Sequence, residues 1–271
     1  MSVKYYEKER IFKLDTPNTS YILGVVDEEN FVGHAYYGRK LKDYNVGYLM
    51  RTKEAPFVPS QNNRDRVSFL DSFPMEYPGN GLGDYRGSCI SVKTEEGHAA
   101  VSLSYVSHKI YAGKPKLEGL PATFATEGEC ETLELTCEDK ALGLEVVLIY
   151  SAFSDVDVIA RSVKVKNVGK KNIYLTKVLS ACVDMDNKDF ELLTMHGSWA
   201  RERMIEYRKV GHGYQGVESF RGESSHQDHP FMALKAKNAT QETGEVYGFH
   251  FVYSGNFMGQ VELNQIGRAH V

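Results

Sequence analysis

The sequence has little of what marks a membrane, secreted or nucleic-acid-binding protein. No apolar run approaches the roughly 20 residues that a helix needs to cross a bilayer, so we expect no membrane contact. The opening stretch, MSVKYYEKERIFKL, is polar and lacks the apolar core of a signal peptide, which favours a cytoplasmic location. A formal net charge of -4 provides no basic footprint, and we therefore expect no nucleic-acid partner.

Cysteine is also scarce, and its spacing excludes the common cysteine-based sites. Cys89, Cys130, Cys137 and Cys182 form no CxxC pair and fit no zinc motif. A chain of 271 residues can bury a sizeable core and does not need disulfide bonds for stability. We interpret the four as isolated, mostly buried thiols, and we expect no metal and no cofactor.

Long segments with the 3.6-residue period of a helix are almost absent, and a period of two dominates. Residues 158–179 read as two strands joined by a turn at 167–172, and 184–209 is the only stretch that could form a short helix or a long loop. Further candidate strands lie within 22–38, 98–111, 144–154 and 244–257. More than ten candidate strands predict an all-β fold, a large antiparallel two-sheet sandwich with very little helix.

One polar stretch, ESFRGESSHQDHPFMAL (218–234), has the residue types of a hydrolase triad or a metal site. These residues are Ser224, Ser225, His226, Asp228 and His229, with His196 as a further candidate metal ligand. Triad members come from distant parts of a chain, whereas Ser225 and His226 are neighbours, and no G-x-S-x-G motif is present. A polar loop that satisfies backbone groups is the favoured interpretation.

Two other motifs resemble ligand-binding loops but lack a required part. DMDNKDFE (184–191) has Lys188 at the third oxygen position of a calcium loop, and no glycine follows it. GNGLG (79–83) is not followed by a helix that could hold a phosphate. We therefore expect an acidic turn and a glycine turn.

The single tryptophan, Trp199, lies in the irregular segment HGSWARER (196–203), beside Arg201 and Arg203. An aromatic ring in a polar loop is a common way to hold the apolar face of a sugar. The alternative is a tryptophan buried between sheets, and the local residues alone favour this alternative.

Six separated motifs, in order, resemble the N-terminal domain of bacterial α-galactosidases of glycoside hydrolase family 36. They are YAGKPKLEGLPAT, ETLEL, DVIARS, SWARER, RGESSHQDHPFMAL and GEVYGFHFVYSGNF. The resemblance spans residues 3–265 and implies a galactose-mutarotase-like β-supersandwich over 1–265. One departure is Asp228–His229, where the family usually has Gln-Asn or His-Asn before Pro-Phe.

The resemblance also implies a function. In the family, a (β/α)8 barrel downstream carries both catalytic aspartates of a retaining mechanism, and no such barrel is present here. The implied substrate is an α-galactoside oligosaccharide of the raffinose or melibiose type, and the implied assembly is a homotetramer. Trp199 corresponds to a tryptophan of the substrate pocket, and Glu54 to an acidic residue that reaches a substrate site across subunits.

A stand-alone carbohydrate-binding or assembly module without catalysis remains the alternative function. The last residues, IGRAHV (266–271), resemble the translation of a sequencing adapter, so we interpret them as a non-native tail.

Overall fold

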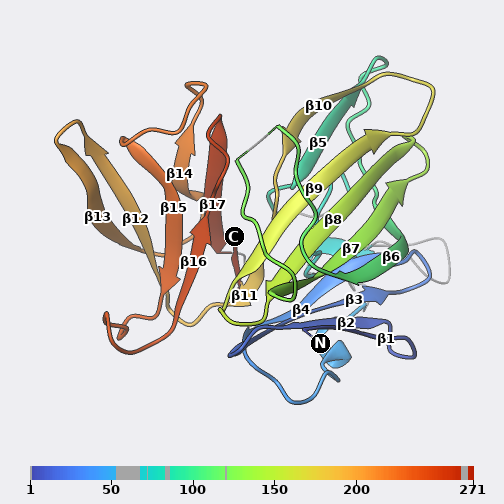
Figure 1. Ribbon diagram of the computed structural model, residues 1–271. Helices are drawn as coiled ribbons and strands as arrows, with labels where there is room; N and C mark the ends of the chain where they lie inside the picture. The colour runs from blue at the N-terminus through green and yellow to red at the C-terminus, as the bar shows by residue number, and fades with distance from the viewer. Residues whose placement is uncertain (1, 53–67, 72, 83–85, 120, 264–267) are drawn as a thin grey trace. The chain divides into compact units, whose positions relative to one another are not determined.

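The computed structural model describes residues 2–52, 68–71, 73–82, 86–119, 121–263 and 268–271 (Figure 1). The chain forms two compact units. The first comprises Met1–Pro115 and Phe124–Asp184, and the second Lys116–Thr123 and Met185–Val271. The described residues contain 18 strands, two short 3-10 helices and no helix long and apolar enough to cross a membrane.

The first unit contains two four-stranded sheets and a two-stranded ribbon (Figure 1). The sheet of order β1-β2-β3-β4 consists of Val3–Tyr6, Ile11–Asp15, Thr19–Val26 and Phe31–Arg39. The sheet of order β6-β7-β8-β9 consists of Ser104–Ala112, Cys130–Asp139, Leu144–Phe153 and Ile159–Asn167. The ribbon pairs β5 (Ile90–Thr94) with β10 (Ile173–Val178), and the 3-10 helices are η1 (Gly47–Leu49) and η2 (Ser68–Asp71).

The second unit contains two further four-stranded sheets. One has the order β13-β12-β15-β16 and consists of Arg201–Lys209, Glu191–Ser198, Asp228–Lys235 and Val246–His250. The other has the order β11-β18-β17-β14 and consists of Asp184–Asp186, Arg268–His270, Phe257–Leu263 and Gln215–Ser219. A Cβ added at Gly259 of β17 would lie 3.4 Å from the thioether of Met232 of β15, so the two sheets face each other across that contact.

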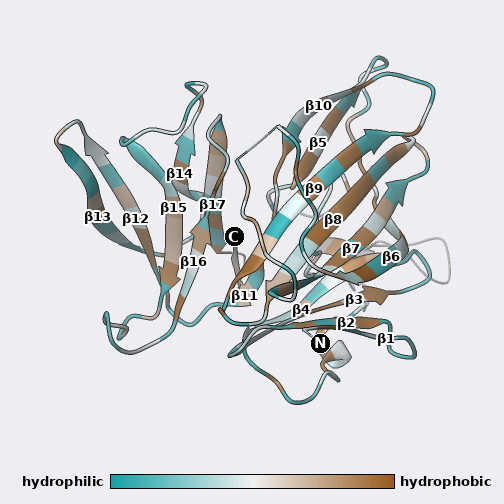
Figure 2. Cartoon of the chain, viewed as in Figure 1, coloured by the Kyte–Doolittle hydropathy of each residue, from teal (hydrophilic) through white to brown (hydrophobic). Residues whose placement is uncertain are grey.

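Alternating burial explains why the central strands of the first unit pair as they do. Along β7, Leu133, Leu135 and Cys137 are buried, and the residues between them are partly exposed. One face of the strand therefore packs inward, as the alternation of apolar and polar residues in Figure 2 shows. In contrast, β3 is buried on both faces, because apolar residues outside its sheet, such as Met50 and Phe69, pack on one side.

The predicted fold class is confirmed, because the strand pairings within the β1–β4, β6–β9 and β13-β12-β15-β16 sheets are all antiparallel and helix is minimal in the described residues. The two strands predicted within 158–179 are present as β9 and β10, but they do not pair with each other, because β9 pairs with β8 and β10 pairs with β5. The helix or loop expected for 184–209 is wrong, because this segment forms β11, β12 and β13. Two predicted strands are shorter than expected: β6 begins at Ser104, and β16 ends at His250.

The cysteines need one correction. All four are buried and free, as predicted. They are not all isolated, because Cys89 lies close enough to Cys182 for the two thiols to hydrogen-bond. Burial raises the pKa of the Cys89 thiol well above its ordinary value, so it is a poor nucleophile at neutral pH.

Candidate functional site

Trp199 lies at the tip of the hairpin that joins β12 to β13. Ser198 pairs with Arg201 across the hairpin, so Trp199 and Ala200 form a two-residue turn. The indole is 85% exposed, which excludes the alternative of a tryptophan buried between sheets. A large aromatic side chain at an exposed turn can provide a flat apolar surface for a ligand.

The backbone that carries Trp199 is unusual in three places. Ala200 and Arg203 have positive φ values of 63° and 57°, in a region that residues other than glycine rarely adopt. Each such residue costs about 1 kcal/mol or more, and it persists only where neighbouring contacts fix it. Gly197 is also constrained, because an added Cβ would lie 2.2 Å from the carbonyl oxygen of Arg201.

The strand that follows the turn is open to solvent along its whole length. All nine residues of β13 are exposed, and the strand pairs only with β12 in its sheet. Its exposed apolar side chains include Met204, Ile205 and Tyr207. Large apolar side chains that gather on one exposed strand indicate a surface that another body covers.

The polar stretch 218–234 does not form a triad. Ser225 Oγ accepts a hydrogen bond from the Gln227 backbone, and the Ser224 backbone N–H donates to Ser254. No hydrogen bond joins either serine to a histidine among the contacts of the described residues. His226 is exposed, and residues 220–227 form the predicted polar loop, whereas Asp228 and His229 are the first residues of strand β15.

The histidines of this region do not form a metal site either. Nδ1 of His196 lies 2.7 Å from Asp228 Oδ1, and its Nε2 lies 2.8 Å from Thr194 Oγ1, so both ring nitrogens are engaged. Burial lowers the pKa of His229, and the nearby Arg203 and His250 lower it further. Within the described part of the chain, no group of three His, Cys, Asp or Glu side chains could hold a metal ion.

The other predicted sites have different outcomes. Glu54, the second predicted substrate contact, lies outside the described residues. The acidic motif 184–191 contributes strand β11, and Asp184 is buried beside Arg86 at 3.3 Å, so it is not a solvated turn. In the described part of the glycine motif, Gly79 forms a β-bridge with Ile90, and residues 80–82 form bends.

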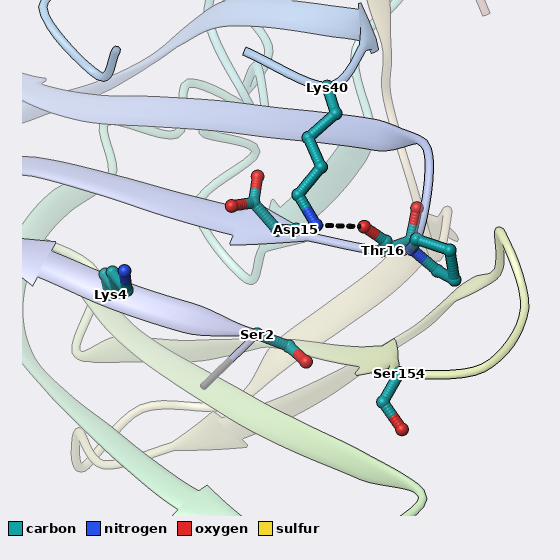
Figure 3. Close-up of a pocket in the computed structure, with 7 residues that line it drawn as sticks. Ser2, Lys4, Asp15, Thr16, Lys40 and Ser154 are labelled. Atoms are coloured by element: carbon teal, nitrogen blue, oxygen red, sulfur yellow. Dashed lines mark hydrogen bonds between the residues drawn. The ribbon is translucent and has the colours of Figure 1, made fainter. Parts of the chain in front are cut away.

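A polar hollow of about 350 Å³ lies in the first unit (Figure 3). Its lining residues are Ser2, Lys4, Asp15, Thr16, Pro17, Lys40 and Ser154. Most of their polar groups are already engaged: Lys40 Nζ donates to the Thr16 carbonyl at 2.8 Å, and Asp15 accepts from Lys13 and Ser20. These hydrogen bonds connect β1, β2 and the neighbouring loops, so the hollow offers few free polar groups to a ligand.

A buried charged cluster in the first unit was not foreseen from the sequence. The carboxylate of Glu76 accepts hydrogen bonds from the hydroxyls of Tyr21 and Tyr150, each at 2.7 Å. Arg161 Nη1 lies 3.0 Å from the same carboxylate, and His34 Nδ1 lies 3.0 Å from its other oxygen. The guanidinium of Arg161 also stacks on Tyr150, with 3.9 Å from Cζ to the ring centroid.

Perturbed titratable groups often mark active sites, but this cluster has no access for a substrate. Glu76 and His34 are fully buried, and the side chain of Arg161 is only 10% exposed. Its partners come from β3, β4, β8 and β9, which belong to different sheets. The cluster therefore links the two four-stranded sheets of the first unit.

Acidification should destabilise the first unit through Glu76. Burial favours the neutral acid, but Arg161 and His34 outweigh it, and the pKa of Glu76 lies below its ordinary 4.5. A carboxyl with a depressed native pKa contributes stability above about pH 4.5, and this contribution is lost as pH falls through the native value. The melting temperature should fall more steeply below about pH 4.5 in the wild type than in Glu76→Gln. Parallel curves would contradict this assignment.

The sequence is similar to proteins of a known family. Residues 30–271 match the family described as "Glycosyl hydrolase family 36 N-terminal domain". α-Galactosidase AgaA of Geobacillus stearothermophilus is 41% identical over all of this chain and 37% of its own length. α-Galactosidase Mel36A of Lactobacillus acidophilus is 38% identical over 99% of this chain and 37% of its own.

Solved structures agree with the sequence comparisons. The crystal structure of family 36 α-galactosidase AgaB from Geobacillus stearothermophilus superposes with a TM-score of 0.92 at 42% identity, over 100% of this chain and 37% of its own. The crystal structure of an AgaA variant in complex with raffinose superposes with a TM-score of 0.90 at 41% identity, over 96% of this chain and 36% of its own. The chain thus spans little more than a third of the length of these relatives.

Proposed function

Because the chain belongs to the glycosyl hydrolase family 36 N-terminal domain family, we propose that it is the N-terminal part of an α-galactosidase. The proposed enzyme hydrolyses terminal α-galactosyl residues of raffinose- or melibiose-type oligosaccharides with retention of configuration. The observation that carries this proposal is identity of about 40% along the whole chain with proteins named α-galactosidases. The complex of one relative with raffinose supports the substrate class.

Within this proposal, the chain positions the substrate and does not supply the reactive groups. Retaining glycosidases need two carboxyl groups about 5–5.5 Å apart, one as nucleophile and one as acid and base. We assign both to a barrel encoded downstream of this chain. The role of the chain is to hold the sugar, and the exposed indole of Trp199 supports that role.

The exposed strand β13 supports a further part of the proposal. We propose that the enzyme is a cytoplasmic homotetramer, in which surfaces such as β13 are covered by the rest of the enzyme or by another subunit. All nine residues of β13 are exposed in this chain alone, and an exposed strand with several apolar side chains is expected to be covered in the complete enzyme. Glu54 is the proposed second substrate contact, contributed across subunits.

The 271-residue chain by itself should not cleave an aryl α-galactoside, because the proposed carboxylates lie outside it. The measurement is release of the chromophore by the purified chain, with His226→Ala as the matched variant. Turnover that follows the purified chain and is lost in His226→Ala would show that the polar loop is catalytic after all.

The alternative function is a non-catalytic carbohydrate-binding or assembly module. The natural gene separates the two, because an open frame continuing into a barrel with two aspartates supports the enzyme. A stop codon soon after the sandwich supports the module. Reading the natural gene also tests whether residues 266–271 are native.

A further inference from the structure

The turn that presents Trp199 is held by a carboxylate of the next strand. The backbone N–H of Ala200 donates to Glu202 Oε1 at 2.9 Å, across the two-residue turn. Hydrogen bonds from Glu202's own backbone N–H and from that of Ala200 hold the pKa of this carboxyl below its usual range. The carboxylate is therefore ionised at neutral pH and accepts both bonds.

The hairpin end would not keep this shape through strand pairing alone. The register between β12 and β13 shifts between His196 and Ser198, so the ladder is interrupted just before the turn. Ala200 and Arg203, which precede and follow Glu202 in the sequence, both have positive φ. Residues in such conformations need specific contacts to fix them, and the Glu202 carboxylate provides one directly at Ala200.

We propose that Glu202 is a positioning residue for Trp199: its carboxylate fixes the Ala200 backbone and so holds the indole in one orientation. Glu202 itself touches no substrate. The proposal has two parts. The binding of a sugar by the indole rests on the proposed function, whereas the anchoring of the turn by Glu202 does not. An indole that is already ordered loses less conformational entropy when a sugar stacks on it.

The chain offers a direct readout, because Trp199 is its only tryptophan. Fluorescence excited selectively at tryptophan therefore reports the mobility of this turn in the 271-residue protein. Glu202→Ala should lower the steady-state anisotropy of Trp199 and increase its quenching by acrylamide. Glu202→Gln should retain most of the wild-type anisotropy, because its side-chain carbonyl can still accept the Ala200 N–H.

Glu206→Ala is the matched control. It removes a carboxylate from the same exposed strand, but Glu206 pairs with Arg208 at 2.9 Å and not with the turn. Its anisotropy should equal that of the wild type. Equal losses in Glu202→Ala and Glu206→Ala, or equal behaviour of Glu202→Ala and Glu202→Gln, would overturn the proposal. So would an unchanged anisotropy in Glu202→Ala.

A kinetic arm uses the product of the complete natural gene. Glu202→Ala should raise KM for raffinose about two- to tenfold with little change in kcat, because binding must then order the indole. An unchanged KM for Glu202→Ala where Trp199→Ala raises KM would also overturn the positioning role. If Trp199→Ala leaves the kinetics unchanged, the pocket assignment fails, and the anisotropy result still decides the anchoring of the turn.

Discussion

Glu76→Ala should lower the melting temperature of the first unit more than any surface substitution. The change removes the only carboxylate within 4.0 Å of the Arg161 guanidinium among the described residues, and leaves a charge and two hydroxyls without their acceptor. Removing one partner of a buried ion pair costs about 3–5 kcal/mol. For a unit of this size, that corresponds to a fall of roughly 6–20 °C, measured by circular dichroism or calorimetry.

Two controls separate the buried charge from a general effect of mutation. Lys171→Ala removes a partner from a pair with Glu96 that is exposed on both sides, so the melting temperature should stay within error of the wild type. Replacing both charges with apolar residues, as in Glu76→Leu with Arg161→Met, should recover much of the loss, because no unpaired charge remains. A fall in Glu76→Ala no larger than in Lys171→Ala would show that the cluster contributes little.

Trp199→Ala should weaken substrate binding in the complete enzyme without weakening the fold. Loss of an aromatic stacking contact costs about 1–3 kcal/mol, which corresponds to a rise in KM of roughly five- to 150-fold. A smaller fall in kcat is expected if the glycosidic oxygen is less well placed. Because the indole is 85% exposed, its removal leaves no internal cavity, and the melting temperature should be unchanged.

The matched variant for this prediction is Tyr174→Ala. Tyr174 is a large exposed aromatic residue on β10 of the first unit, whereas the Trp199 turn belongs to the second unit. It should leave KM for raffinose near the wild-type value. A large fall in melting temperature together with unchanged kinetics in Trp199→Ala would contradict the pocket assignment.

Local sequence patterns predicted where several strands lie but not which strands pair, since β9 and β10 belong to different sheets. The segment 158–179 has alternating apolar residues around a turn, and it forms β9 and β10 as expected. The segment 184–209 was misread because β13 is exposed on both faces and so has no inward-facing apolar set to alternate. The pairing of β13 with β12 is set by backbone hydrogen bonds, which leave no signature in residue types.

The Glu76 cluster could not be predicted from local patterns, because its members are far apart in the chain. Tyr21 and Tyr150 lie 55 and 74 residues from Glu76, and Arg161 lies 140 residues from Tyr21. The available signal was the position of Arg161, which alternates along the strand with the apolar residues Ile159 and Val163. Trp199 was singled out from the sequence, but only the structure shows that its indole is exposed and that the Ala200 N–H donates to Glu202.

The measurement that tests the proposed function most directly is galactose release from raffinose by the product of the complete natural gene. The 271-residue chain, purified in parallel, serves as the comparison. We expect the complete product to release galactose and the 271-residue chain to release none. A complete product that folds and leaves raffinose intact would contradict the proposed α-galactosidase activity.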